Sequence, residues 1–164
     1  MPVDPKTFLL VHVLLSLVGL FAGLVVVGGL MAGVRFGRWA GLFLATTVLT
    51  SATGFGFPSA QVLPSHIVGA LSLLVLLGAI AALYLKHLEG GWRTTFVVLS
   101  VAALYLNVFV LLAQLFVKIP AMAMLAPSPQ APVFAVTQGL VLVLFIVLGL
   151  AAVNGFRNMP ARGA

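Results

Sequence analysis

The sequence contains no cysteine and very few charged residues, and both absences narrow what the protein can be. Without cysteine there is no disulfide, no thiolate metal ligand and no cysteine nucleophile. Charged residues make up 6% of the 164 residues and hydrophobic residues 63%, whereas soluble domains carry about 25% charged residues. So few charges cannot cover a domain with a hydrated surface. We therefore predict an all-α, polytopic integral membrane protein with a single transmembrane domain over residues 1–164.

Carboxylates are the scarcest polar group, because Asp4 and Glu89 are the only two acidic residues. Neither lies in an apolar run, so the sequence lacks the membrane-embedded acids that many coupled transporters use. No nucleophile–histidine–acid set can be assembled either, and we expect a protein that is not an enzyme. The net charge of +6 comes from Lys and Arg residues that separate apolar runs. We attribute them to orientation in the membrane and predict no nucleic-acid partner.

Five apolar runs are long enough for helices that cross a hydrocarbon core of about 30 Å. They cover residues 7–34, 39–55, 62–85, 92–116 and 133–154. Each run is predicted to be helical, since lipid offers no hydrogen-bond partner to an open backbone. The first run is longer than the apolar part of a cleavable signal peptide, which is about 7–15 residues. We interpret it as a retained first span.

The basic residues alternate between the two sides of this five-helix bundle. The first connection, the third connection and the C-terminal tail hold six Lys and Arg residues. The N-terminal segment and the fourth connection hold one each, and the second connection holds none. The positive-inside rule then places the N-terminus outside the cytoplasm and the C-terminus inside. We predict the inner membrane of a bacterium as the location, the lipid bilayer as the main partner, and other membrane subunits or a second copy as the alternatives for a protein partner.

Small residues recur at helical spacing, as in the pairs Gly19/Gly23 and Gly29/Gly33. Such pairs let membrane helices approach closely, and we predict packing rather than ligand binding for them. Threonines with similar spacing, such as Thr46 and Thr53, are interpreted in the same way.

The strongly polar residues gather in the outer half of the predicted bundle. An amide or imidazole in hydrocarbon costs several kcal/mol unless it finds a partner. We therefore expect these groups to meet in the bundle interior and to form a ligand or cofactor site. The candidate binding residues are His12, Thr50, His66, Asn107, Gln114, Lys118 and Gln138.

Three functions stay open for this cluster. The first is an accessory or binding protein with a polar site in the outer leaflet, for a quinone or a lipid headgroup. The second is a membrane redox protein, in which His12 and His66 bind a b-type haem, a metal ion or a quinone. The third is a small-solute transporter, which the lack of membrane-embedded acids and of an evident repeat disfavours. The connection 119–132 either lies flat on the membrane or folds over the cluster as a lid.

Overall fold

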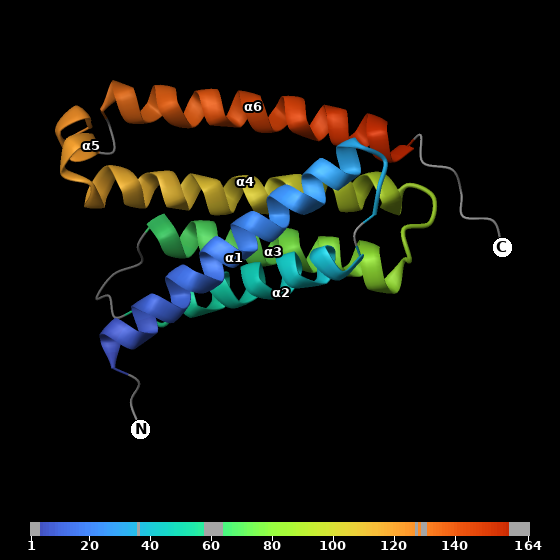
Figure 1. Ribbon diagram of the computed structural model, residues 1–164, viewed down its shortest axis with the longest axis horizontal. Coiled ribbons are helices and arrows are strands. Elements are labelled where there is room, and N and C mark those ends of the chain that lie inside the picture. Colours follow the sequence, from blue (N-terminus) through green and yellow to red (C-terminus); the bar gives the residue numbers. More distant parts are fainter. Residues whose placement is uncertain (1–3, 36, 58–63, 127, 129–130, 158–164) are drawn as a thin grey trace.

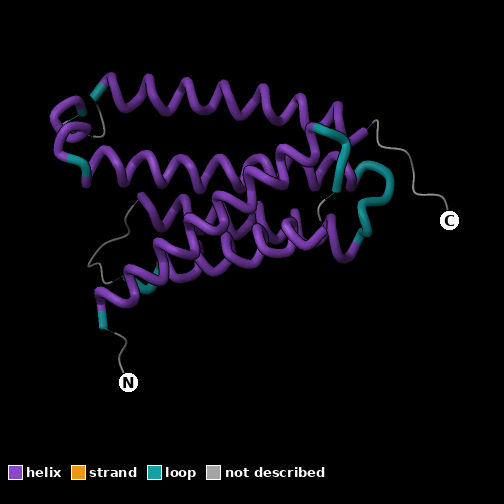
Figure 2. The backbone as a smooth tube through the Cα atoms, viewed as in Figure 1, coloured by secondary structure: helices purple, strands orange, loops and turns teal. Residues whose placement is uncertain are grey.

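The computed structural model describes residues 4–35, 37–57, 64–126, 128 and 131–157, and within these ranges every regular element is helical (Figures 1 and 2). The prediction of an all-α chain is therefore confirmed for this part of the protein. The elements are α1 (Pro5–Met31), α2 (Gly37–Gly54), α3 (Pro64–Ile80), which continues as the π-helix η1 (Ala81–Leu85), α4 (Trp92–Lys118), the short α5 (Pro120–Leu125) and α6 (Pro132–Arg157).

Four of these helices are long and apolar enough to cross a membrane: Pro5–Met31, Pro64–Leu85, Trp92–Lys118 and Pro132–Arg157. Many of their large apolar side chains are exposed, among them Ile67, Leu74, Leu77, Leu140 and Leu150, each more than 60% exposed. Apolar surface on this scale is compatible with lipid contact rather than with water. The findings therefore support a membrane helical protein, while the fifth span and the orientation stay predictions. Helix α2 has 18 residues and contains four threonines, which makes it the least apolar of the long helices.

The helix ends follow from local backbone chemistry. Asp4 caps α1, accepting a hydrogen bond from the backbone N–H of Thr7 at 3.3 Å. The first span was predicted to continue to residue 34, but α1 ends at Met31, and Gly33 adopts φ +67° just beyond it. Helix α4 ends at Lys118 because the next residue precedes Pro120 and is extended. That proline begins α5, a helix that the sequence did not predict.

The long helices lie roughly along one axis, and α4 runs between α3 and α6 (Figure 1). Helix α1 crosses this layer diagonally: its C-terminal end contacts α6, and its N-terminal half follows α2 instead. We call the end of the bundle where Arg35, Arg38, Lys86, Arg93 and Arg157 lie the basic end, and the opposite end the cavity end. The first turn of α1, Lys118 and α5 belong to the cavity end (Figure 1).

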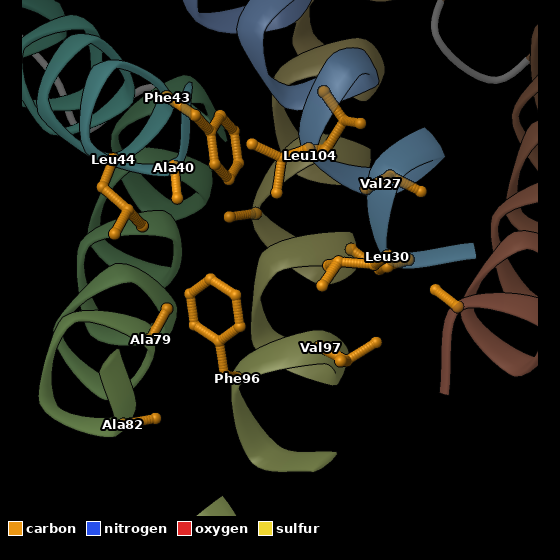
Figure 3. Packing of buried hydrophobic residues seen from close by; sticks show 14 of the residues in the cluster. Val27, Leu30, Ala40, Phe43, Leu44, Ala79, Ala82, Phe96, Val97 and Leu104 are labelled. Atoms are coloured by element: carbon orange, nitrogen blue, oxygen red, sulfur yellow. The ribbon is translucent and has the colours of Figure 1, made fainter. Parts of the chain in front are cut away.

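Close packing of apolar side chains fills the half of the bundle toward the basic end (Figure 3). Phe43 of α2 and Leu104 of α4 are fully buried and point toward one another. Both lie against Gly23 of α1, where an added Cβ would be 2.7 Å from Leu104 Cδ1 and 2.8 Å from Phe43 Cε2. At the far end, a Cβ on Gly155 of α6 would collide with the carbonyl oxygens of Met31 and Leu30. Helices α1 and α6 are therefore in backbone contact there.

Candidate functional site

A cavity of about 460 Å³ opens between α1, α2, α3 and α4 at the cavity end. It exists because α1 diverges from α6 after their contact at the basic end and lies against α2 (Figure 1). Its walls are largely aliphatic and aromatic, from Leu9, Val13, Leu17, Phe55, Phe57, Val68, Leu106, Val110, Leu111 and Leu115. Six of the seven predicted binding residues also line it, namely His12, Thr50, His66, Asn107, Gln114 and Lys118. Their role in binding stays a prediction.

The cavity is elongated along the bundle axis. On α4 its wall extends from Leu106 to Lys118, which is about 18 Å at the helical rise of 1.5 Å per residue. Thr47 on α2 and Asn107 on α4 lie toward the deep end, and Lys118 lies at the mouth. Gln114 and Lys118 are both exposed, so the mouth carries an amide and an ammonium group above an apolar interior.

His12 is held by one defined hydrogen bond at mid-depth of the cavity. Its Nδ1 lies 2.8 Å from Thr53 Oγ1. That hydroxyl also lies 2.7 Å from the carbonyl oxygen of Leu49. The direction of the His12–Thr53 hydrogen bond depends on the tautomer of the imidazole, because Thr53 Oγ1 can accept from Nδ1–H or donate to Nδ1. The second ring nitrogen, Nε2, is an acceptor in the first case and an N–H donor in the second.

His66 enters the cavity wall from the first turn of α3. Its ring is half-buried and stacks on Phe55, with 5.5 Å between the ring centroids and 16° between the planes. Phe55 in turn lies close to Gly69, where an added Cβ would be 3.3 Å from Phe55 Cε2. Phe57 meets His12 edge to face with centroids 5.1 Å apart. Each predicted histidine therefore stands beside an aromatic ring at the mouth.

Two side-chain pairs hold the walls of the cavity together. Ser16 Oγ of α1 donates to Asn107 Oδ1 of α4 at 3.0 Å, and Asn107 Nδ2 donates back to the carbonyl oxygen of Ser16 at 3.4 Å. Ser51 Oγ of α2 lies 3.1 Å from Ser72 Oγ of α3. These hydrogen bonds join α1 to α4 and α2 to α3. Asn107, predicted as a binding residue, is thus already engaged within the protein.

Two threonine hydroxyls on the α2 wall are buried without a partner among the described residues, those of Thr47 and Thr50. Thr47 is only 1% exposed, and its hydroxyl lies against Gly19 of α1, where an added Cβ would be 3.0 Å from Thr47 Oγ1. A buried hydroxyl without a partner is unfavourable. Thr50 was predicted from the sequence as a binding residue, whereas Thr47 was not. The i, i+3 spacing of the two residues was the available signal, since it places both on one helix face. Thr46, next to Thr47, instead donates to the carbonyl oxygen of Leu42 at 2.7 Å, as a packing residue would.

Gln138 is the predicted binding residue that the structure does not bring to the cavity. It lies on α6 and is 7% exposed, and its Nε2 donates to the carbonyl oxygen of Phe109 on α4 at 3.1 Å. Helix α6 packs on the side of α4 away from α2, so Gln138 joins these two helices outside the cavity wall (Figure 1). None of the described residues of the segment 119–132 lines the cavity either, and the lid interpretation gains no support.

No group of three or more His, Asp or Glu side chains that could hold a metal ion occurs in the described ranges. His12 and His66 are the two histidines that line the cavity among the described residues. A haem or metal at this site would therefore have to be held by this pair alone or with groups other than carboxylates.

Comparison of the chain with protein-family models finds no match, and comparisons with curated proteins and with solved structures find none. The function therefore has to be inferred from the cavity and from the chemistry of the side chains in its walls.

Proposed function

We propose that the protein is a five-span inner-membrane binding protein, whose cavity takes up a small amphipathic molecule from the outer leaflet. The observation that carries this proposal is a largely apolar cavity of about 460 Å³ with His12 and Asn107 in its wall. Ligand sites for small molecules have this size and composition, with an apolar lining and a few well-placed polar groups. A ligand with a polar head would meet the polar side chains of the wall, and its apolar part would fill the rest.

The five-span topology is supported by the position and length of α2. Its 18 residues correspond to about 27 Å of helix, close to the thickness of a hydrocarbon core. It runs alongside α1 and α3, both of which are long and apolar enough to cross the membrane (Figure 1). Its threonines face inward or bond to their own helix, so their polarity does not oppose insertion. The five basic residues of the basic end support a cytoplasmic position for that end.

Haem binding is the second candidate, and one observation favours it. His12 and His66 share the cavity, and Nδ1 of His12 is hydrogen-bonded to Thr53 Oγ1. A hydrogen bond of this kind fixes the ring orientation of many metal-binding histidines. An absorption spectrum separates the two candidates. A Soret band that vanishes in His12→Ala and His66→Ala would favour haem, whereas a colourless, metal-free protein would favour the amphipathic ligand.

Topology is tested with single cysteines, because the chain has none of its own. Val34→Cys and Ser65→Cys flank α2, and both positions are exposed. A membrane-impermeant maleimide should label Ser65→Cys on intact cells and Val34→Cys only after permeabilisation. Labelling of both from the same side would show that α2 does not cross the membrane. The reversed pattern would show that the predicted orientation is wrong.

Ligand binding is tested by native mass spectrometry of the protein purified from its own membrane in a mild detergent. We expect a bound organic molecule of defined mass. In Leu111→Trp, which fills the cavity with an indole, that mass should disappear. Leu140→Trp is the matched control, since Leu140 is 67% exposed on the outer face of α6. Equal occupancy in both variants would place the molecule outside the cavity and contradict the proposal.

A further inference from the structure

We infer that the ligand is an anionic lipid, bound with its head beside Lys118 at the mouth and one acyl chain along the cavity. A fatty acid and an acidic phospholipid share this chemistry. The inference rests on the binding function proposed above and specifies the class of molecule. It also implies that the lipid enters sideways from the outer leaflet, between α1 and α4.

The first step is the charge of the cavity wall. Lys118 is the only Lys, Arg, Asp or Glu that lines the cavity in the described part of the chain, and its side chain is exposed. The two carboxylates of the protein lie elsewhere, since Asp4 caps the first turn of α1 and Glu89 lies in the connection at the basic end. Carboxylate and phosphate groups both accept charge-assisted hydrogen bonds from lysine. An anionic head therefore complements the charge of the mouth.

The second step is that the polar groups of the deep wall are engaged within the protein or face away from the cavity. Ser16 is hydrogen-bonded to Asn107, and Ser51 to Ser72. The two unpaired threonine hydroxyl oxygens of α2 have less than 1 Å² of accessible surface each. The deep cavity is therefore bounded mainly by leucine and valine side chains, which suit an acyl chain better than a second polar group.

The third step is the length of the cavity. Its wall on α4 extends from Leu106 to Lys118, which is about 18 Å of helix. A fully extended residue of three backbone bonds spans about 3.6 Å, so an extended chain advances about 1.2 Å per bond. An acyl chain of about 14 carbons would therefore reach from the mouth to the deep end.

The fourth step is the route of entry. Val13 and Leu17 of α1 line the cavity and are nevertheless 39% and 47% exposed. Gln114 on the α4 wall is exposed as well. The Ser16–Asn107 pair joins the two helices at the deep end, whereas toward the mouth α1 lies against α2. The cavity thus opens between α1 and α4 toward lipid, and a chain can enter there while its head stays at the membrane surface.

A neutral amphiphile, such as a quinone or a fatty alcohol, is the competing occupant. It would fill the aliphatic part of the cavity equally well, but it would bring no countercharge to Lys118. Lysines near helix ends already reach toward the membrane surface, so the ammonium group needs no ligand in order to be stable there. The charge of the head therefore separates the two classes of ligand, and the test varies this charge while the chain stays the same.

The test is displacement of radiolabelled myristate from the full chain in a non-ionic detergent, by unlabelled myristate or by tetradecanol. We expect myristate to bind about tenfold more tightly, the effect of one charge-assisted hydrogen bond. In Lys118→Gln this preference should fall to about twofold or less, and Lys118→Arg should keep most of it. Lys6→Gln is the matched control, since Lys6 is exposed at the same end but does not line the cavity. Equal binding of acid and alcohol, or equal losses in the two glutamine variants, would overturn the inference.

The position of the chain is tested with a myristate that carries a photoreactive diazirine at its terminal carbon. We expect the label on the deep wall, on peptides that contain Leu17 or Leu106. Leu111→Trp should abolish this labelling, because the indole fills the cavity. A label mainly on the outer face of α6, around the exposed Leu140, would place the chain in the surrounding detergent and overturn the inference.

The molecule extracted from the protein purified from its own membrane identifies the source. Either a fatty acid or an acidic phospholipid, absent from Leu111→Trp, would support the inference. A neutral molecule that is lost in that variant would overturn it and leave the binding function standing. If the protein carries no molecule and binds neither probe, both are wrong. A Soret band would also overturn both, since haem would then occupy the site.

Discussion

The two halves of this bundle are made from the same helices and yet are held together differently. Toward the basic end, fully buried side chains such as Phe43, Phe96 and Leu104 form one apolar core. At the cavity end, α1 separates from α6, and hydrogen bonds such as Ser16–Asn107 replace part of that packing. Membrane helices lack a hydrophobic driving force toward one another. Close packing therefore holds one half, and polar bonds keep the other half together while leaving space for a ligand.

The largest effect is expected at the backbone contact of the packed half. Gly155→Val would drive a side chain into the carbonyl oxygens of Met31 and Leu30. We expect a loss of about 3 kcal/mol or more in the free energy of unfolding, because backbone cannot move aside as a side chain can. The measurement is reversible unfolding in mixed micelles. Gly139→Val on the same helix is the matched control, since nothing lies within 4 Å of a Cβ there. Similar losses in both variants would contradict the contact.

The second largest difference in stability between the two halves is expected when an aromatic side chain is truncated to alanine. Phe43 is 0% exposed in the packed half, whereas Phe55 is 45% exposed at the mouth of the cavity. We expect Phe43→Ala to lower the free energy of unfolding by about 3 kcal/mol, the lower end of the range for buried Phe. Phe55→Ala should cost about 1 kcal/mol or less, because solvent or lipid already reaches the ring. If Phe55→Ala proved as costly, the cavity end would be packed as tightly as the basic end.

The polar bond between α1 and α4 should contribute less than the apolar packing. Ser16→Ala removes the hydroxyl that donates to Asn107 Oδ1, and Asn107→Leu removes both hydrogen bonds of the pair. We expect a coupling energy of about 0.6 kcal/mol from their double-mutant cycle. Gln114→Leu, at an exposed position on the same helix, is the control and should leave stability unchanged. A coupling energy near zero would mean that the cavity walls hold without this bond.

The smallest effect on stability is expected at Thr47, and its sign matters more than its size. Thr47→Val removes a buried hydroxyl that has no partner among the described residues, so the ligand-free protein should become more stable by about 0.5 kcal/mol. Thr46→Val, one residue away, removes a hydroxyl bonded to Leu42 and should not stabilise. Thermal unfolding of the delipidated protein compares the two. Destabilisation by Thr47→Val would show that the hydroxyl has a partner within the protein.

The long helices were predictable from the sequence because apolar runs of this length are forced into helices in lipid. Predicted and observed ends agree within three residues for α1 to α4 and for α6, counting η1 with α3. The rotation of each helix about its axis was harder to predict. In lipid, the faces toward neighbours and the faces toward solvent are both apolar, so hydropathy does not distinguish them. Gln138 illustrates this. Its position along the bundle axis is that of the other predicted binding residues, but it lies on the face of α6 where its side chain bonds to the carbonyl oxygen of Phe109.

The diagonal crossing of α1 was also not predictable from the sequence, because it depends on where the backbones of two helices can come into contact. Gly19 and Gly23 were predicted to let helices pack closely, and they do: a Cβ on Gly19 would lie 3.0 Å from Thr47 Oγ1. A glycine pair does not indicate which neighbouring helix packs against it or at what crossing angle. Thr47 was missed for the same reason, since its burial depends on Gly19 across the interface.

The contact between α1 and α6 has a consequence for how the protein is made. A membrane chain emerges from the ribosome in order, so α1 enters the bilayer well before α6. Helices α2, α3 and α4 are available to α1 early, but Gly155, which fixes the C-terminal end of α1, is synthesised after all of them. The tilt of α1, and with it the width of the cavity, is therefore settled only at the last step of biosynthesis. A nascent chain that stalls before α6 would expose a half-built site to the bilayer.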